Sequence, residues 1–270
     1  MIYGNFGLNA GKLAWILGTS VLYPKGNKNY RNYRWGRDKD RKNTLPYIIN
    51  LGCKKSELPK NVKILNYNSE LASDKIYTFD KFLEINLPIP RYFKNLEDVN
   101  IFPILGRKNK SYQGRGITFY KDKEKINSHD FFVEYIKVKK EFRIHVFQEE
   151  IIGEMNKTFN DSNIIHTSNT GAKLIFSKID HNCREEILKK SIEAVKCIDL
   201  DFGAVDIIVD QDDNFYFLEV NSDPGMANSI AFAYGFHIAN KLKIDIDSEV
   251  LEFFKNLKVP ESFVYNAAVN

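Results

Sequence analysis

Asp206, Glu219 and Asn221 are the residues of this sequence whose types and spacing best suit metal binding. They lie in or next to two short apolar runs, 204–209 and 215–220, whose separation by a polar turn predicts a β-hairpin. Residues two apart on a strand share a face, and a residue of the partner strand can reach that face too. Carboxylate and amide oxygens suit Mg²⁺ better than zinc or softer metals. The pattern predicts a magnesium site, and the alternative is a hairpin whose polar residues simply face water.

Length and composition indicate a globular protein of enzyme size. The chain has 270 residues, of which 43% are hydrophobic and 13% aromatic, and this excludes a disordered chain. No run reaches the roughly 18 apolar residues that span a bilayer, and the first residues lack the order of a signal peptide, so we expect a cytoplasmic protein. Cys53, Cys183 and Cys197 form no metal-ligand pattern. A net charge of +4 does not by itself argue for nucleic acid.

The first part of the chain reads as a small α/β unit with a basic insertion. A helix over 10–17 and strands over 46–51 and 62–65 are predicted. Between them, residues 25–42 interleave eight basic side chains with three aromatic ones, in a composition that could bind an acidic partner or stack on bases. A solvated surface loop is the alternative, because charge runs usually just face water.

The middle of the chain combines a helix with a loop suited to anions. Residues 73–85 predict a helix capped by Ser73 or Asp74, with an apolar stripe of Ile76, Phe79, Phe82 and Leu83. A strand at 102–105 leads into a basic loop with Gly114 and Gly116, whose backbone N–H groups can turn toward an anion. We expect a further helix before the next strand at 131–136.

The second half of the chain supplies strands and long helices. In the strand 141–147, alternation places Glu141, Arg143 and His145 on one face, so the strand should be half-buried. Arg143 could bind phosphate or a carboxylate, or form a structural salt bridge to Glu141 or a neighbour, whereas His145 reads as a structural histidine. A return strand at 151–157 and an amphipathic helix at 183–198 are predicted, followed by helices at 228–241 and 247–257.

The segments 201–208 and 217–225 together resemble the metal-binding end of the ATP-grasp superfamily. They are most similar to ligases of the ribosomal-protein glutamate ligase type (RimK-like) and to small ATP-grasp proteins often encoded by phages. Segments between Ser73 and Met226 follow the family's order. The resemblance implies an α+β ATP-grasp fold with a pre-ATP-grasp α/β unit at 1–72, a central lid domain at 73–137, a C-terminal metal-binding domain at 138–260 and a tail at 261–270.

The resemblance also implies roles for individual residues. Asp206, Glu219 and Asn221 would hold Mg²⁺, or Mn²⁺, between the phosphates of ATP, and Arg143 and Lys157 would act on the transferring phosphate. Contacts to the nucleotide would come from Lys75, Arg107, Ser111, Gly114 and Gly116, and from backbone groups of Glu134, Tyr135 and Ile136 at the adenine. The family usually has lysine where this chain has Arg107, and it usually has more arginines and a Gly-Gly pair near 166–171.

The implied activity is ATP-dependent ligation of a carboxylate to an amine through an acyl phosphate, with release of ADP and phosphate. The substrates would be amino acids, a peptide or a protein. Two alternatives stay open: a nucleotide-binding protein without ligase activity, and a nucleic-acid-directed ATP-grasp enzyme that uses the segment 25–42.

Overall fold

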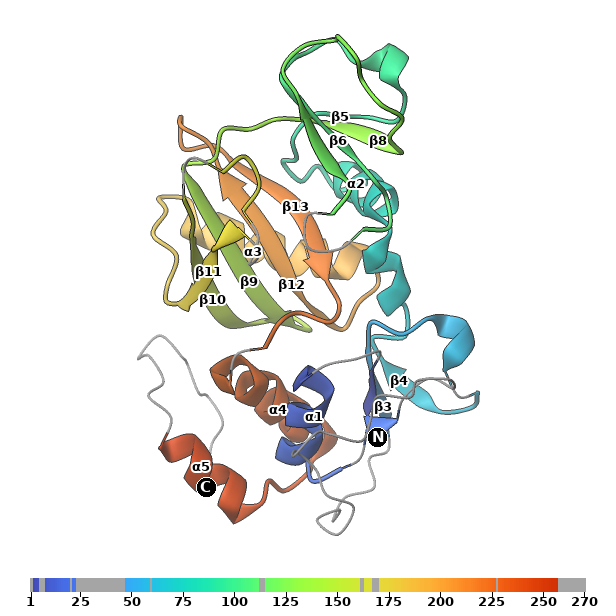
Figure 1. The fold of residues 1–270 in the computed structure, drawn as a ribbon. Coiled ribbons are helices and arrows are strands. Elements are labelled where there is room, and N and C mark those ends of the chain that lie inside the picture. Colours follow the sequence, from blue (N-terminus) through green and yellow to red (C-terminus); the bar gives the residue numbers. More distant parts are fainter. Residues whose placement is uncertain are drawn as a thin grey trace.

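The structure is a computed structural model, and it describes residues 2–4, 8–19, 21–22, 47–58, 60–111, 115–160, 163–166, 170–226 and 228–256. The basic aromatic segment 25–42, Gly114 and the expected tail 261–270 lie outside the described residues. The described strands form three sheets, and these sheets follow one another along the chain (Figure 1). The last two helices return to pack on the core of the first sheet.

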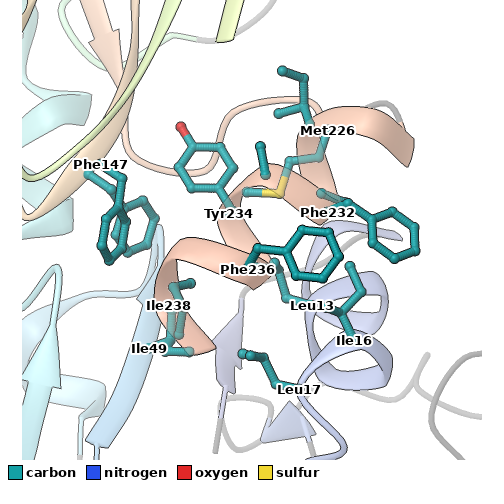
Figure 2. Close-up of a cluster of buried hydrophobic side chains, with 14 of the residues drawn as sticks. Leu13, Ile16, Leu17, Ile49, Phe147, Met226, Phe232, Tyr234, Phe236 and Ile238 are labelled. Atoms are coloured by element: carbon teal, nitrogen blue, oxygen red, sulfur yellow. The ribbon is translucent and has the colours of Figure 1, made fainter. Parts of the chain in front are cut away.

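The N-terminal sheet is parallel and has the order β2-β1-β3-β4. Its strands are β1 (Ile2–Gly4), β2 (Val21–Leu22), β3 (Tyr47–Leu51) and β4 (Lys63–Leu65), with helix α1 (Leu8–Ile16) and 3₁₀ turns η3 (Lys55–Glu57) and η4 (Ser69–Ser73). Helix α4 (Asn228–Leu242) packs on the same apolar core, as Figure 2 shows. Helix α5 (Ser248–Lys255) packs on that core as well. Residues from both ends of the chain therefore share one core.

The lid sheet is antiparallel and has the order β5-β8-β6-β7. Its strands are β5 (Tyr92–Phe93), β6 (Ile104–Arg107), β7 (Ile117–Tyr120) and β8 (Phe131–Glu134), with the 3₁₀ turn η5 (Leu96–Asp98). The helix predicted before residue 131 is wrong, because residues 117–120 pair with β6 and turns follow them. Residues 121–125 alternate charges without an apolar stripe, so they offer a helix nothing to bury.

Helix α2 (Lys75–Glu84) connects the N-terminal unit to the lid. Asp74 caps it, because its side chain accepts a hydrogen bond from the Tyr77 N–H at 3.0 Å. Phe79 and Phe82 are fully buried, but Leu83 is 51% exposed, so the predicted stripe is wrong at that position. Leu83 is one residue, about 100° of helix, beyond Phe82 and therefore faces away from the core.

The largest sheet is antiparallel and has the order β11-β10-β9-β12-β13. Its strands are β9 (Lys140–Phe147), β10 (Glu150–Thr158), β11 (Lys173–Phe176), β12 (Phe202–Val209) and β13 (Phe215–Asn221). The predicted hairpin is confirmed as β12 and β13. Helix α3 (Arg184–Cys197) covers one side of this sheet, as Figure 1 shows.

The two sides of this sheet differ in chemistry, and we name them by it. The apolar face packs under α3 in one core and carries Phe142, Ile144, Val146, Val205, Ile207, Val209, Phe217 and Val220. The polar face carries Glu141, Arg143, His145, Lys157, Asp206, Glu219 and Asn221. Strand β9 was expected to be half-buried, but it is covered on both faces: His145, on the polar face, is fully buried and contacts Tyr234 of α4.

Candidate functional site

The strand register places the charged residues of the polar face side by side. Arg143 of β9 lies opposite Asp206 of β12, and Asp206 lies opposite Glu219 of β13. One step along the sheet, Glu141 lies opposite Lys157 of β10. Because directly opposed residues on neighbouring strands share a face, these five side chains form one continuous patch.

Arg143 and Asp206 form a buried two-point ion pair at the centre of this patch. Arg143 donates from Nε and Nη2 to the two carboxylate oxygens of Asp206 at 2.6 and 2.7 Å. Burial alone would disfavour both charges, but each partner's attraction outweighs it: the pKa of Asp206 is lowered and that of Arg143 is raised. The salt bridge that the sequence allowed for Arg143 thus goes to Asp206, while Glu141 pairs elsewhere.

Glu219 and Asn221 extend the patch toward the lid. The Asn221 amide nitrogen lies 3.3 Å from an oxygen of Asp206 and 3.4 Å from one of Glu219, so the three predicted metal ligands converge. Arg107 of β6 reaches across from the lid sheet, with Nη2 4.0 Å from Glu219 Oε2. The lid and the largest sheet therefore meet over these residues.

Arg107 is held on its other side by an aromatic ring, and one of its donors is left over. Its guanidinium lies 5.6 Å from the centre of the Phe131 ring, and the residue is 8% exposed. Burial lowers its pKa, and the nearby Glu219 opposes that shift. Its Nε is buried and has no hydrogen-bond partner within the described part of the chain. A buried cation with a spare donor is suited to an anionic ligand.

Lys157 and His166 enclose a third carboxylate, that of Glu141. Lys157 Nζ pairs with Glu141 Oε1, and His166 Nδ1 lies 3.2 Å from Oε2. The His166 ring stacks on Phe159 at 3.7 Å between ring centres, and its other nitrogen lies 3.0 Å from the Asn163 carbonyl. Lys157 therefore lies at the edge of the same patch, and its ion pair with Glu141 orients its ammonium group.

The predicted phosphate-binding loop lies next to the start of α2. Lys75, the first residue of that helix, is buried, and its Nζ donates to the Ser111 carbonyl at 2.7 Å. Burial lowers the pKa of Lys75, and Glu219 acts against that shift. Gly116 has a φ of +71° and closes the loop by accepting from the Lys108 N–H at 3.0 Å. Lys75, Ser111 and Gly116 thus come together beside the start of α2, and their role at phosphate stays a prediction.

The segment expected at the adenine begins at the end of β8, and the protein already uses some of its backbone N–H groups. The Glu134 N–H donates to the Arg91 carbonyl at 2.8 Å, and the Tyr135 N–H donates to the Pro103 carbonyl at 3.0 Å. The Glu134 carboxylate makes two hydrogen bonds to the Arg91 guanidinium at 3.0 and 3.1 Å. No described backbone group accepts from the Ile136 N–H.

Two networks around the site were not expected from the sequence. His145 Nδ1 lies 3.2 Å from the Tyr234 hydroxyl, which donates to the Gly203 carbonyl at 3.0 Å and points out of the apolar cluster in Figure 2. At the other end, the Asn109 side chain donates to Asp74 and accepts from the Ile76 N–H in the first turn of α2, and the Asn109 backbone N–H donates to the Asp130 carboxylate. Long-range partners of this kind leave no periodic signal in the sequence. A local sign is that Asn109 follows Arg107 and Lys108 at the end of β6.

The donor set fits a hard divalent cation bound together with phosphate. Asp206 and Glu219 offer carboxylate oxygens at one point, and the side-chain amide of Asn221, which donates to both of them here, carries a further oxygen suited to a metal. Arg107, Arg143 and Lys75 lie around this set with their positive charges. Within the described ranges there is no group of three or more His, Cys, Asp or Glu side chains arranged to hold a metal. The site therefore depends on two carboxylates, an amide and the ligand's own oxygens.

Several solved structures share this fold at low sequence identity. The ATP-grasp ligase PsnB with its minimal precursor matches with a TM-score of 0.60 at 11% identity, over 93% of this chain and 97% of that one. N5-carboxyaminoimidazole ribonucleotide synthetase from Thermotoga maritima gives 0.64 at 15%, over 92% and 76%. D-alanine–D-alanine ligase from Bacillus anthracis with ATP gives 0.60 at 17%, over 94% and 97%. At these identities the likeness establishes the fold.

Sequence comparison identifies the family. No curated protein sequence matches the chain. No described helix is long and apolar enough to cross a membrane. The model of the RimK-like ATP-grasp domain, however, matches residues 63–253, which is more than half of the chain. The chain therefore belongs to the RimK-like ATP-grasp family, a family of ADP-forming carbon–nitrogen ligases that use ATP and Mg²⁺.

Proposed function

We propose that this protein activates a carboxylate with ATP and joins it to an amine. The observation that carries the proposal is the convergence of Asp206, Glu219 and Asn221 on the polar face, with Arg107 of the lid 4.0 Å from Glu219. This arrangement combines oxygen donors for Mg²⁺ with cations for phosphate at the meeting point of two sheets. The metal and the cations are both needed to hold a nucleoside triphosphate and to offset the charge that shifts during phosphoryl transfer.

Each charged residue then has a role in the proposed reaction. Mg²⁺ on Asp206, Glu219 and Asn221 would neutralise charge on the phosphates. Arg107 and Lys75 would hold the phosphates from the lid side, and backbone groups near Ser111 and Gly116 would contact them too; Gly114, which the resemblance assigns to the same loop, lies outside the described residues. Arg143 and Lys157 would face the transferring phosphoryl group, because Asp206 and Glu141 direct them to the same patch. In this proposal, positively charged groups would stand on both sides of the reacting phosphate.

The end of β8 supplies a site for the base. Of the backbone N–H groups of Glu134, Tyr135 and Ile136, the first two donate within the protein, and that of Ile136 has no described backbone acceptor. We assign the Ile136 N–H to an acceptor on the purine edge. The Glu134 carboxylate, which is tied to Arg91, would position this segment rather than contact the nucleotide itself.

The chemistry proceeds in two balanced steps. A carboxylate oxygen attacks the γ-phosphorus, the bond to the β-phosphate oxygen breaks, and ADP leaves with an acyl phosphate formed. The amine then attacks the acyl carbon, the carbon–oxygen bond to phosphate breaks, and the amine loses its proton to give an amide. No protein nucleophile is required, and the protein acts by position and charge.

The substrates and the setting belong to the proposal as well. An amino acid, a peptide or a protein could supply the carboxylate and the amine, and the segment 25–42 could bind an acidic partner. We propose a cytoplasmic location, where ATP and Mg²⁺ are plentiful. The resemblance to phage-encoded ATP-grasp proteins stays a prediction about origin, as do the domain boundaries at 72, 137 and 260.

The proposal is tested by Mg²⁺-dependent ADP release with pooled amino acids and acidic peptides, with hydroxylamine added to trap the acyl phosphate as a hydroxamate. Glu219→Ala is run beside the wild type, and Glu186→Ala, on the outer side of α3, is the matched control. We expect ADP and hydroxamate from the wild type and the control, and neither from Glu219→Ala.

Other outcomes would favour the two alternatives. A wild type that is stabilised by ATP but yields no ADP with any pool would favour a nucleotide-binding protein. ADP release that requires nucleic acid would favour a nucleic-acid-directed enzyme. A melting temperature that ATP and Mg²⁺ leave unchanged would contradict the proposed site.

A further inference from the structure

A hollow outside the polar face lies at the edge strand of the N-terminal sheet. It has a volume of about 490 Å³, within the range of ligand-binding clefts. The residues around it come from η3, the following turn, β4 and the turn after β4, and we call this surface the β4 groove: Lys55, Ser56, Leu58, Lys60, Asn61, Val62, Ile64 and Tyr67. None of these residues takes part in the proposed reaction.

The rim of the β4 groove is positively charged. Lys55 and Lys60, the two lysines that line it, are both exposed, and no described carboxylate forms an ion pair with either of them. Glu57 is the only acidic residue between positions 54 and 63, and it accepts a hydrogen bond from the Lys54 backbone N–H at 3.1 Å. The local excess of positive charge favours an acidic ligand.

The floor of the β4 groove is apolar. Leu58 is buried and Ile64 half-buried, while Val62 and Tyr67 are 47% and 42% exposed. Lys55 Nζ lies 4.3 Å above the Tyr67 ring and 3.3 Å from the Asn68 side-chain oxygen, so this lysine is held beside the hollow. A ligand that placed apolar side chains on Val62 and Tyr67 would bring its neighbouring carboxylates next to the lysines.

The third feature is a strand edge. Among the described strands β4 pairs only with β3, and it forms the outer edge of the sheet (Figure 1). An extended peptide can add to such an edge through backbone hydrogen bonds, and alternate side chains then point into the adjoining hollow. In such a peptide, apolar and acidic residues would alternate.

We propose that the β4 groove binds an acidic, extended segment of the polypeptide that the enzyme modifies. This proposal rests on the proposed function and names the class of its partner. It favours a peptide over nucleic acid, because residues 47–72 contain no arginine for two-point phosphate contacts and the floor is apolar. Binding away from the polar face would raise the local concentration of the reacting carboxylate or amine.

The test measures binding of a short fluorescein-labelled peptide that alternates glutamate with leucine, by fluorescence polarisation and without ATP. The charge test is Lys55→Glu with Lys60→Glu, and its matched control is Lys189→Glu with Lys241→Glu, which makes the same charge change at exposed lysines elsewhere. The floor test is Val62→Ser. We expect about tenfold weaker binding for the groove pair, no change beyond about twofold for the control pair, and about threefold weaker binding for Val62→Ser.

Three results would overturn the groove proposal: equal losses in the two lysine pairs, equal binding of a peptide that alternates glutamate with serine, or displacement of the peptide by single-stranded DNA at lower concentration than by unlabelled peptide. Hydroxamate formation with a small carboxylate separates this proposal from the proposed function. The groove variants should retain it, and its absence in the wild type would count only against the ligase chemistry.

Discussion

The two faces of the five-stranded sheet are built from the same strands but have different roles. On the apolar face, alternate residues of β9, β12 and β13 pack under α3. On the polar face, the residues between them form ion pairs with one another and with the lid. Moving one residue along a strand, from Ile144 to Arg143 or from Ile207 to Asp206, leads from a side chain packed in the core to a charged side chain in an ion pair.

The comparison shows how a buried charge cluster can be held in place. Removing Asp206 and Arg143 from water is unfavourable; their attraction keeps both groups charged, but a buried ion pair adds little net stability over two apolar side chains. Glu141 pairs separately with Lys157. The apolar face supplies the burial that holds the strands in register, so the charges stay opposed even though their own contribution to stability is small. We therefore expect substitutions on the two faces to separate stability from activity.

The largest effect is expected from Asp206→Ala, which leaves Arg143 buried without its partner. Stability should fall by about 4 kcal/mol in urea denaturation, and activity should be lost. The double variant Arg143→Met, Asp206→Leu should recover most of the stability and none of the activity, because it removes both charges together. A double variant as unstable as the single one would show that the pair itself stabilises the sheet.

On the apolar face, Phe217→Ala should destabilise the protein by about 3 kcal/mol, because it leaves a cavity beside Phe82 and Phe215. The affinity of the folded variant for MgADP should stay within about twofold of the wild type. Phe217→Leu, which fills more of the space, should cost less stability. A tenfold loss of nucleotide affinity in Phe217→Ala would mean that the two faces are coupled.

The pH dependence of stability should expose the buried histidine of the polar face. Burial lowers the pKa of His145 to about 3, and Arg143 adds to that shift, with Asp206 opposing it; the other group facing the ring is the Tyr234 hydroxyl. Below the ordinary histidine pKa near 6.5 the unfolded chain binds a proton that the folded chain does not, so stability falls as pH falls. Between pH 7 and pH 5 this loss should be about 2 kcal/mol.

His145→Asn removes this titration while keeping a donor for Tyr234, so its stability should change less than that of the wild type over the same pH range. The neighbouring Ile144→Val, on the apolar face, should keep the full pH dependence. Equal pH dependence in His145→Asn and the wild type would contradict a neutral, buried imidazole.

The smallest effect should come from Leu83, where the same alternation of faces applies to a helix. Leu83→Ser should change stability by less than about 0.5 kcal/mol, because the side chain already faces solvent. Phe82→Ala, one residue away, should cost several times more. A large loss for Leu83→Ser would indicate that a partner covers this side chain in solution.

Local patterns predicted the elements that carry the site. The apolar runs around a polar turn gave β12 and β13, and the cap and stripe gave α2 within two residues. Spacing alone placed Glu219 and Asn221 on one face, and the hairpin brought Asp206 to them. These features depend on residues close in sequence, where periodicity is informative.

Long-range order could not be predicted in the same way. The partner of Arg143 is Asp206 because β12 adds beside β9 after the chain has passed through β10, β11 and α3. No spacing rule identifies that neighbour, nor the packing of α4 on the sheet that brings Tyr234 onto His145. The helix expected before residue 131 is replaced by β7 and turns, because residues 117–120 pair with β6, a partner that lies ten or more residues away and that local periodicity does not show.

The central claim is that the polar face binds nucleotide together with Mg²⁺. Isothermal titration of ADP with and without Mg²⁺, for the wild type and Glu219→Gln, tests it most directly. We expect Mg²⁺ to tighten ADP binding to the wild type at least about tenfold, and Glu219→Gln to lose this gain while binding metal-free ADP as before. ADP affinity that does not depend on Mg²⁺ in the wild type, or a gain that Glu219→Gln retains in full, would contradict it.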